Sequence, residues 1–199
     1  MALVDHYFTN NNNLKSEIKE LNYVYGDTKL TFFSDNGVFS KDRIDYGSRV
    51  LVDTFIKNFK KRGSILDVGC GYGYMGITLS KVLDTHVTMV DVNKRALHLS
   101  EMNIAKNKAN CTHFESDAYE NVKEKFDYII TNPPVHAGKE VLLKILLGAK
   151  EHLNEEGELW YVLRKDQGAK SIEKLLNEHY EVQNIEKSKG FYIFRCIIH

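Results

Sequence analysis

From residue 63 onward, short apolar runs alternate with longer segments in which apolar positions recur at helical spacing. Short apolar runs between turns are typical of buried strands, and a 3.6-residue period is typical of helices that pack on a sheet. Strands separated by helices favour right-handed crossovers and a mainly parallel sheet, so the pattern predicts an α/β fold. The expected strands are 65–68, 86–90, 111–114, 126–131, 158–163 (after a turn at Gly157), 180–187 and 190–198, and the expected helices are 74–83, 93–107, 137–150 and 168–178.

Both ends of the chain depart from this alternation. Only Ser188-Lys189-Gly190 separates the last two expected strands, which predicts an antiparallel pair at one edge of the sheet. Alternating apolar residues in 17–34 surround a Gly-Asp turn, as in a β-hairpin, and helical spacing predicts a helix over 46–60. We therefore expect a hairpin extension, residues 1–45, packed on a core domain of residues 46–199.

The composition of the 199 residues is that of an ordinary folded protein, with 43% hydrophobic and 27% charged residues and only 2 prolines. The formal net charge is zero, which gives no overall electrostatic indication of a nucleic-acid partner. A local basic patch is still compatible with RNA, and two sets of lysines and arginines are candidates. They are Lys57, Lys60, Lys61 and Arg62, and Lys187, Lys189 and Arg195, although either set could be an ordinary solvated surface.

Three scattered cysteines, Cys70, Cys111 and Cys196, have neither the CxxC spacing of a zinc site nor the even count of a disulfide framework. We expect reduced thiols and no metal. No apolar run approaches the roughly 18 residues that a membrane span requires. The run Asn10–Asn13, expected to be a loop, follows the start too closely for a signal peptide. We therefore expect a cytoplasmic protein without a membrane partner, either a monomer or a homodimer.

A glycine-rich segment lies directly between the strand expected at 65–68 and the helix expected at 74–83. Glycines at such a strand-to-helix turn let a ligand approach the backbone closely. The GxGxG pattern alone also occurs in ordinary loops, so its weight depends on polar residues at the neighbouring strand ends. The candidate ligand-binding residues of this segment are Asp67, Gly69, Gly71 and Gly73.

Two further candidate positions follow the next two strands. Asp91, with Val92 beside it, comes about 20 residues after the glycines, where a carboxylate can accept both hydrogen bonds of a ribose diol. The alternative is that Asp91 caps the next helix. Asp117 and Ala118 follow the third strand, and Asp117 could accept a hydrogen bond from an adenine amino group, unless this loop is simply solvated. Carboxyl ends of parallel strands are where open α/β sheets bind ligands.

Asp67 indicates the charge of the expected ligand. A dinucleotide fingerprint usually begins with glycine at this turn, and an acid is unfavourable beside a pyrophosphate. The third glycine of GxGxxG is also missing, because position 74 is Tyr. An acid here suits a ligand that carries cationic ammonium and sulfonium groups.

The segment Asn132-Pro133-Pro134-Val135 follows the strand expected at 126–131 and holds both prolines of the chain. Two consecutive prolines fix two φ angles and lack amide donors, so they predict a rigid loop whose free carbonyl can point into a site. The side-chain oxygen of Asn132 is a second acceptor. Two acceptors directed at one point suit an NH2 group, which has two protons to donate. The alternative is a purely structural turn.

The order of these motifs over residues 63–199 resembles the class I S-adenosylmethionine-dependent methyltransferases. The resemblance implies a Rossmann-like, seven-stranded, mostly parallel sheet with helices on both faces, and S-adenosyl-L-methionine as cofactor. Asn-Pro-Pro after the fourth strand resembles the amino-methyltransferases that act on adenine, guanine or glutamine nitrogens. Those families often place an aromatic residue after the prolines, where it can stack on the target. Val135 occupies that position here, which argues against a typical adenine-N6 enzyme.

A narrower resemblance combines the segment Gly37–Ser48 with Asn132–Gly138. Together they resemble the guanine-N2 methyltransferases of small-subunit ribosomal RNA. In that family the catalytic module often follows a degenerate duplicate of itself, so this chain would be a single-module member. The resemblance implies that Phe39 and the Asp45–Ser48 loop help to close the donor or target pocket, and that Val135 and His136 contact the target. As alternatives, Phe39 is a core residue and His136 an ordinary surface residue.

The function predicted from these resemblances is methylation of the exocyclic N2 amine of a guanine in ribosomal RNA. Asn132 and the Pro133 carbonyl would accept the two amine hydrogens and direct the nitrogen lone pair at the methyl group, and the donor would also contact Asn132. One alternative is a glutamine-amide N5-methyltransferase acting on a protein, although that family typically has Tyr after the prolines. The other is a non-catalytic module that binds S-adenosylmethionine or RNA.

Overall fold

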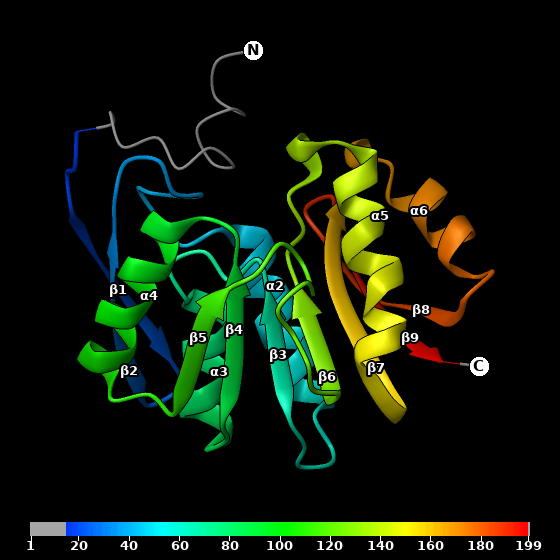
Figure 1. The fold of residues 1–199 in the computed structure, drawn as a ribbon, viewed down its shortest axis with the longest axis horizontal. Coiled ribbons are helices and arrows are strands. Elements are labelled where there is room, and N and C mark those ends of the chain that lie inside the picture. The colour runs from blue at the N-terminus through cyan, green and yellow to red at the C-terminus, as the bar shows by residue number, and fades with distance from the viewer. Residues whose placement is uncertain (1–14, 199) are drawn as a thin grey trace.

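The apolar runs of the sequence form the strands of one seven-stranded sheet (Figure 1). The computed structural model describes residues 15–198, and within them the sheet order is β5-β4-β3-β6-β7-β9-β8. The three central strands are buried at nearly every position, as strands covered on both faces must be. The strands are β3 (Ile65–Val68), β4 (Val87–Asp91), β5 (Cys111–Glu115), β6 (Phe126–Thr131), β7 (Leu153–Arg164), β8 (Tyr180–Ser188) and β9 (Phe191–Ile198).

The direction of the strands places the loops that follow the parallel strands at one edge of this sheet. The strands β5, β4, β3, β6 and β7 are mutually parallel, whereas β9 runs antiparallel between β7 and β8. The carboxyl ends of the five parallel strands therefore lie at the same edge as the β8–β9 turn. The predicted Rossmann-like fold with an antiparallel C-terminal pair is confirmed.

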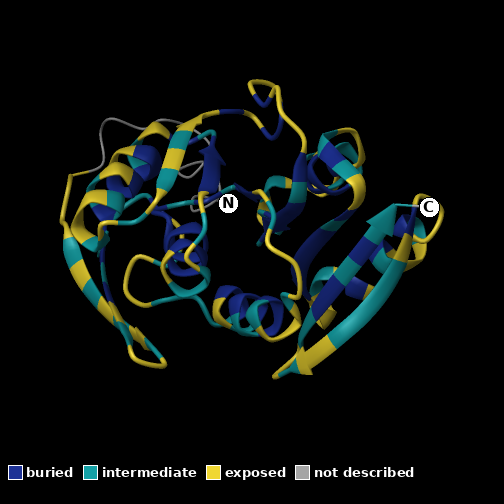
Figure 2. Ribbon diagram, turned by 90° about the horizontal axis from the view of Figure 1, so that it is seen from below, coloured by how far each residue is buried: buried dark blue, intermediate teal, exposed yellow. Residues whose placement is uncertain are grey.

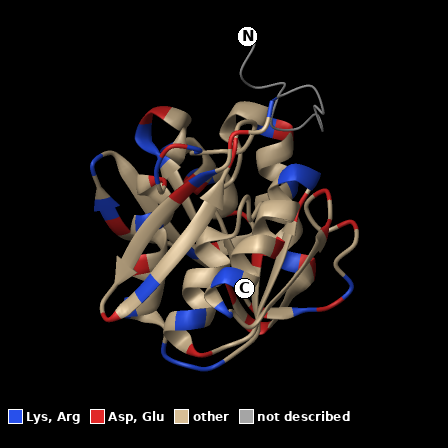
Figure 3. Ribbon diagram, turned by 90° about the vertical axis from the view of Figure 1, so that its left-hand side faces the viewer, with Lys and Arg blue, Asp and Glu red and all other residues tan. Residues whose placement is uncertain are grey.

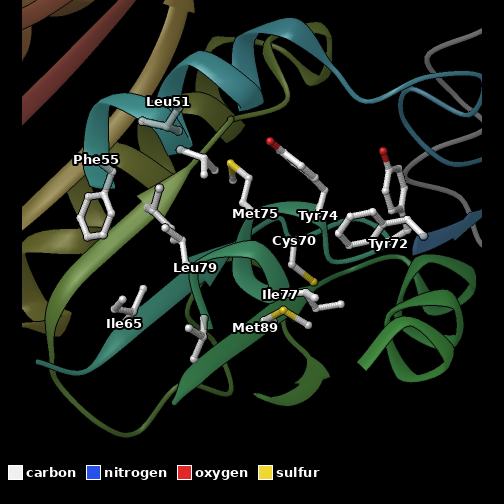
Figure 4. Close-up of a cluster of buried hydrophobic side chains, with 14 of the residues drawn as sticks. Leu51, Phe55, Ile65, Cys70, Tyr72, Tyr74, Met75, Ile77, Leu79 and Met89 are labelled. Atoms are coloured by element: carbon white, nitrogen blue, oxygen red, sulfur yellow. The ribbon is translucent and has the colours of Figure 1, made fainter. Parts of the chain in front are cut away.

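Helices cover both faces of the sheet. Successive residues of a strand point to opposite faces, and those on each face pack with the helices there in a separate core cluster. The helices α2 (Tyr46–Asn58), α3 (Tyr74–Leu83) and α4 (Lys94–Asn107) pack on one face, and α5 (Lys139–Gly148) and α6 (Ala169–Leu176) on the other. Figure 4 shows side chains of α2, β3, α3 and β4 converging in the first cluster, among them Leu51, Ile65, Leu79 and Met89. Figure 2 shows buried residues concentrated on the strands and the inward sides of the helices.

Two elements differ from the sequence prediction. β7 begins at Leu153, earlier than predicted, and its register against β6 jumps before Glu158. Gly157 lies inside this irregularity, where a Cβ would come within 2.8 Å of the Asn154 carbonyl oxygen, so the predicted turn is a bulge in a longer strand. The helix predicted over 137–150 is divided by Gly138, whose φ is 103°, into the short 3-10 helix η1 (Val135–Ala137) and α5, followed by η2 (Ala149–His152).

The predicted N-terminal hairpin is formed by β1 (Lys19–Tyr25) and β2 (Thr28–Ser34). The two-residue turn between them contains Gly26 at φ 54°, the positive value that a tight hairpin turn requires. The apolar side chains Leu30 and Phe32 are buried in the same core cluster as α2, α3 and α4. The hairpin is therefore packed on the sheet domain. Residues 1–14 of the predicted extension, with the Asn10–Asn13 loop, lie outside the described residues.

The free edge of β2 pairs with side chains of α4 instead of with another strand. Asn103 accepts a hydrogen bond from the Phe33 amide at 2.6 Å and donates one to the Phe33 carbonyl at 3.0 Å. One helical turn further on, Asn107 makes the same pair of bonds with Thr31, at 3.0 and 2.8 Å. This asparagine pair satisfies backbone groups that an open strand edge would leave exposed.

The surface formed by residues 15–198 carries charged side chains of both signs (Figure 3). Lysine and arginine alternate with aspartate and glutamate on the side that carries the hairpin (Figure 3). None of the helices formed by these residues has the length and apolar character needed to cross a bilayer. Within the same residues, no group of three or more His, Cys, Asp or Glu side chains could hold a metal ion. Burial raises the pKa of all three cysteine thiols, so none is an activated thiolate.

Candidate active site

The glycine turn between β3 and α3 has the backbone that its sequence predicts. Gly69, Gly71 and Gly73 have φ values of 72°, 57° and 97°, which residues other than glycine rarely adopt. The amides of Gly69 and Cys70 donate to the carbonyl of Val90 at 2.9 and 3.0 Å, so the turn is fixed over the end of β4. A Cβ at Gly69 would have no neighbour within 4 Å, whereas one at Gly73 would come within 2.8 Å of the Ile77 side chain, so Gly69 leaves open space and Gly73 allows close packing of the turn on α3.

Asp91 joins this turn to the start of α4. Its carboxylate accepts hydrogen bonds from the Gly71 and Asn93 amides, both at 2.8 Å, and is almost completely buried. The N-cap of α4 is Asn93, whose side chain accepts from Ala96 N, so the alternative that Asp91 caps this helix is wrong. The carboxylate at the end of β4 holds the position at which an acid contacts a ribose diol in open α/β sheets. Val92 lies beside it, half-buried.

Asp67 is fully buried beneath the turn. One oxygen, Oδ2, accepts a hydrogen bond from the Gly76 amide at 2.9 Å, whereas Oδ1 has no hydrogen-bond partner among residues 15–198. Burial, assisted by the negative charge of Asp91, raises the pKa of the Asp67 carboxyl to about 7. A buried carboxylate oxygen without a partner costs free energy that a cationic ligand would recover.

Side chains of α4 also hold the turn, which the sequence prediction missed. Ser100 Oγ donates to the Gly71 carbonyl at 2.9 Å, and Asn103 donates to the Tyr72 carbonyl at 2.8 Å. Asn103 therefore connects the glycine turn with the β2 edge. The signal in the sequence is a row of polar residues at positions 100, 103 and 107, on the side of a helix that should be apolar.

The loop after β5 reaches the same edge. The Ser116 amide donates to the Asp91 carbonyl at 3.0 Å, and the Ser116 hydroxyl donates to the Ala118 carbonyl at 2.8 Å. Ala118 is buried with a φ of 49°, so the loop is ordered and not merely solvated. Asp117 is half-exposed, and its carboxylate forms an ion pair with Lys144 of α5 at 2.8 Å.

The Asn-Pro-Pro loop is attached to β3 and to the start of α2. Thr131, the last residue of β6, donates from its hydroxyl to the Val68 carbonyl at 2.8 Å. The next residue, Asn132, donates from Nδ2 to Asp45 Oδ2 at 3.0 Å and to Ser48 Oγ at 2.8 Å. An ionised carboxylate only accepts, so Nδ2 must face Asp45 and Oδ1 must point elsewhere. Among residues 15–198, no hydrogen bond reaches Asn132 Oδ1.

The Pro133 carbonyl is not free, which corrects the sequence prediction. It accepts a hydrogen bond from the Val135 amide at 2.9 Å. Pro134, between them, has φ −76° and ψ 82°, which is close to an inverse γ-turn. The proline ring fixes φ near this value, so Pro134 favours the turn and thereby occupies one lone pair of the Pro133 oxygen. A carbonyl has a second lone pair, so Pro133 is still able to accept from a ligand.

The three predicted target contacts have different environments. Phe39 is 52% exposed in the loop that leads to Asp45, so the alternative that it is a core residue is wrong. Val135 is half-buried and packs against the second core cluster. His136 is exposed.

The match to a protein family decides the class of this site. Residues 29–195 match the family model described as the methyltransferase small domain. The chain belongs to this family and is a class I S-adenosylmethionine-dependent methyltransferase. S-adenosylmethionine is its cofactor, and the methyltransferase is related to the ribosomal RNA guanine-N2 enzymes, as the sequence resemblance implied.

Individual relatives of this methyltransferase differ in how much is known of them. It is 43% identical over 197 residues to the uncharacterized protein YbxB of Bacillus subtilis, covering 96% of this chain and 98% of that protein. It is 36% identical over 135 residues to ribosomal RNA small subunit methyltransferase C of Actinobacillus pleuropneumoniae. That match covers 65% of this chain but only 41% of the relative, so the methyltransferase spans less than half of that protein's length.

The fold has a close counterpart among solved structures. A T. thermophilus 16S rRNA N2 methyltransferase (RsmC), in complex with AdoMet and guanosine, superposes with a TM-score of 0.84 at 22% sequence identity. The superposition covers 94% of this methyltransferase and 52% of that chain. At this identity the likeness concerns the fold.

Proposed function

We propose that this methyltransferase modifies the exocyclic N2 amine of a guanine in ribosomal RNA, with Asn132 orienting the amine. The observation that carries the proposal is the fixed orientation of the Asn132 amide. Asp45 and Ser48 occupy its nitrogen, so its oxygen is left as an acceptor in the same loop as the Pro133 carbonyl. Such a pair of acceptors suits a group with two hydrogens to donate, and an ordinary structural turn would not require it.

The methyl donor would occupy the edge formed by the glycine turn and the ends of β4 and β5. The unpartnered Asp67 oxygen and the three positive-φ glycines fit a ligand that is cationic and closely packed on the backbone. When bound, S-adenosylmethionine supplies a methyl group on a positively charged sulfur, already activated for transfer. The proposed donor-binding residues are Asp67, Gly69, Gly71, Gly73, Asp91, Val92, Asp117, Ala118 and Asn132.

The contribution of Asn132 to the reaction is positioning and electrostatics. An aromatic amine is a poor nucleophile because its lone pair is delocalised into the ring. Asn132 Oδ1 accepts one amine hydrogen and the remaining lone pair of the Pro133 carbonyl accepts the other, which directs the nitrogen lone pair outward. The Asp45 carboxylate behind Asn132 polarises the amide, so its oxygen is a stronger acceptor as positive charge develops on the nitrogen.

Guanine in ribosomal RNA is the substrate that the relatives favour. The curated relative with 36% identity is a ribosomal RNA small subunit methyltransferase, and the solved structure with the same fold binds guanosine. The target also needs a stacking partner, because Val135 replaces the usual aromatic residue. Phe39 is the candidate, since it is an exposed aromatic side chain six residues before Asp45. His136 would contact the target from the other side of the loop.

The test is transfer of a radiolabelled methyl group to ribosomal RNA, ribosomal subunits and ribosomal proteins, followed by mass spectrometry of the labelled nucleosides. The proposal expects label in RNA and a single product, N2-methylguanosine. Label in protein would instead identify the glutamine-amide alternative. Absence of label from RNA, in a protein that binds S-adenosylmethionine, would reject the proposal.

A further inference from the structure

Segments from three parts of the chain meet beside Asn132 at the carboxyl edge of the sheet. The Tyr46 hydroxyl of α2 lies 2.7 Å from Ser188 Oγ in the β8–β9 turn. The Lys165 amide, just after β7, donates to the Gly190 carbonyl at 2.8 Å. The start of α2, the end of β7 and the β8–β9 turn are therefore one continuous surface.

Phe191 fixes this surface to the residues that hold Asn132. Its ring lies 5.6 Å from the ring of Tyr46, centroid to centroid. A Cβ placed on Gly47 would come within 2.7 Å of the Phe191 ring and 3.2 Å of Asp45 Oδ2. The ring therefore packs on backbone that only glycine allows, adjacent to the Asp45 carboxylate that orients Asn132.

Cations cover the two aromatic rings. Lys189 Nζ lies 5.0 Å from the Tyr46 ring centre and the Arg49 guanidinium lies 5.6 Å from it. The Arg164 guanidinium lies 5.6 Å from the Phe191 ring centre. All three cations are exposed, as is Lys165, which lines an open depression with Arg164, Asp166 and Gly190. We name Tyr46, Arg49, Arg164, Lys165, Lys189 and Phe191 the rim patch.

We infer that the rim patch binds the backbone of a single-stranded RNA segment and leads the target nucleotide to Asn132. The inference rests on the proposed function and names the surface through which it would act. Four exposed cations are concentrated in the patch. Asp166 neutralises the charge of one of them, Arg164, through an ion pair at 2.7 Å. The whole chain carries no net charge, so this concentration is a local feature. Cations held over aromatic rings are positioned for contact with phosphates.

The other basic residues named from the sequence lie elsewhere. Lys60, Lys61 and Arg62 precede β3, so they lie at the amino edge of the sheet, opposite Asn132. Arg195 pairs with Trp160 across the middle of β7 and forms an ion pair with Glu158. Lys187 lies over Tyr192, which is partly buried and packs against the core cluster of the other sheet face. Of the two sets predicted from the sequence, only Lys189 belongs to the rim patch.

Two triple variants, each losing three positive charges, test the inference. The rim variant is Arg49→Gln, Arg164→Gln, Lys189→Gln, and the matched control at the opposite edge is Lys60→Gln, Lys61→Gln, Arg62→Gln. Binding of a fluorescent single-stranded RNA oligonucleotide is measured by anisotropy over a series of salt concentrations. The rim variant should bind at least about ten-fold more weakly, and its log–log salt slope should fall by about 2, since each lost phosphate contact contributes about 0.7. The control should stay within about two-fold of the wild type.

The inference that the rim patch binds RNA is wrong if the wild type does not bind RNA or if the two triple variants lose RNA affinity equally. It is also wrong if the rim variant binds RNA normally but no longer binds an acidic protein. Calorimetry with S-adenosylmethionine, expected to be unchanged in both variants, verifies that the donor site is intact. The proposed function fails separately. If RNA binds at the rim patch but no N2-methylguanosine forms, the proposed reaction is wrong and the RNA-binding surface is supported. If N2-methylguanosine forms but the rim variant binds RNA as tightly as the wild type, the proposed reaction is supported and the RNA-binding surface is wrong.

Discussion

The side-chain nitrogen of Asn132 lies 3.0 Å from Asp45 Oδ2, across 87 positions of sequence. The same Asp45 oxygen accepts from the Ser48 amide at 2.7 Å and so forms the N-cap of α2. One carboxylate therefore caps the start of α2 and orients the amide of the Asn-Pro-Pro loop. Helix capping and acceptor geometry are coupled at this point.

Replacing Asp45 should separate these two roles. Asp45→Ala removes the cap and should lower the free energy of unfolding by about 1 kcal/mol, and it also frees the Asn132 amide. Asp45→Asn should restore stability, because asparagine caps equally well, but it should restore turnover only in part, since the hydrogen bond from Asn132 is no longer charge-assisted. Denaturant unfolding and initial rates measure both. Full recovery of turnover in Asp45→Asn would show that Asp45 acts only as a cap.

Asn132→Ala should reduce turnover by about 100-fold or more, because the amine loses an acceptor at the reacting nitrogen. Affinity for S-adenosylmethionine, measured by calorimetry, should fall much less than turnover, because Asn132 is one of nine proposed donor contacts. The matched control is Asn154→Ala, since Asn154 also donates to an aspartate, Asp127, at 3.0 Å but lies at the amino end of β7. Turnover within two-fold of wild type in Asn132→Ala would remove this residue from the reaction.

Asp67 should make stability depend on pH in an unusual direction. Its pKa is raised to about 7 by burial, so the folded chain keeps this proton at pH values where the unfolded chain has released it. Its contribution therefore lowers the free energy of unfolding as pH rises from about 4 to about 7, by up to about 1.4 kcal/mol per pH unit. Urea unfolding at pH 5, 6, 7 and 8 measures this, and Asp67→Asn should remove it.

Donor binding provides a second measurement on the same carboxyl. A cationic ligand beside Asp67 favours the ionised form, so binding of S-adenosylmethionine at pH 6 should release a proton. Calorimetry in buffers with different ionisation enthalpies counts that proton. The wild type and Asp67→Asn should differ in both proton release and stability slope, and identical values in the two proteins would show that Asp67 does not titrate.

The asparagine pair of α4 gives a prediction with a built-in control. Asn103→Ala and Asn107→Ala each leave backbone groups of β2 unpaired, so each should lower the free energy of unfolding by about 1–3 kcal/mol. Only Asn103 also holds the Tyr72 carbonyl of the glycine turn, at 2.8 Å. Asn103→Ala should therefore weaken binding of S-adenosylmethionine, while Asn107→Ala leaves it near wild type. Equal affinities in the two variants would disconnect the hairpin from the donor site.

The sequence predicts features that depend on neighbouring residues. Strand and helix positions follow from the period of the apolar residues, and the positive φ values of Gly69, Gly71 and Gly73 follow from residue type. The start of β7 was predicted too late, because Gly157 is a turn residue by composition but a bulge in its tertiary setting. The conformational preference of Gly157 gives no information on which strand pairs with the segment around it.

The site was predicted as separate motifs whose contacts the sequence does not contain. Asp45 and Asn132 were both identified, but their hydrogen bond is a tertiary contact with no local signal. The Pro133 carbonyl was expected to be free, because the backbone bond from Val135 depends on the ψ angle of Pro134, which the proline ring does not fix. The contacts of Ser100 and Asn103 were missed because polar residues on a helix are ordinarily solvated.

The position of β9 between β7 and β8 constrains the order in which the molecule is completed during synthesis. β7 and β8 do not pair with each other, so the sheet beyond β7 cannot form until residues 191–198 have left the ribosome. The strands β3, β4 and β5, with the glycine turn and Asp91, are already available by then. The half of the sheet that carries the glycine turn and Asp91 is thus synthesised first, and the surface beside Asn132 is completed only when β9 is added.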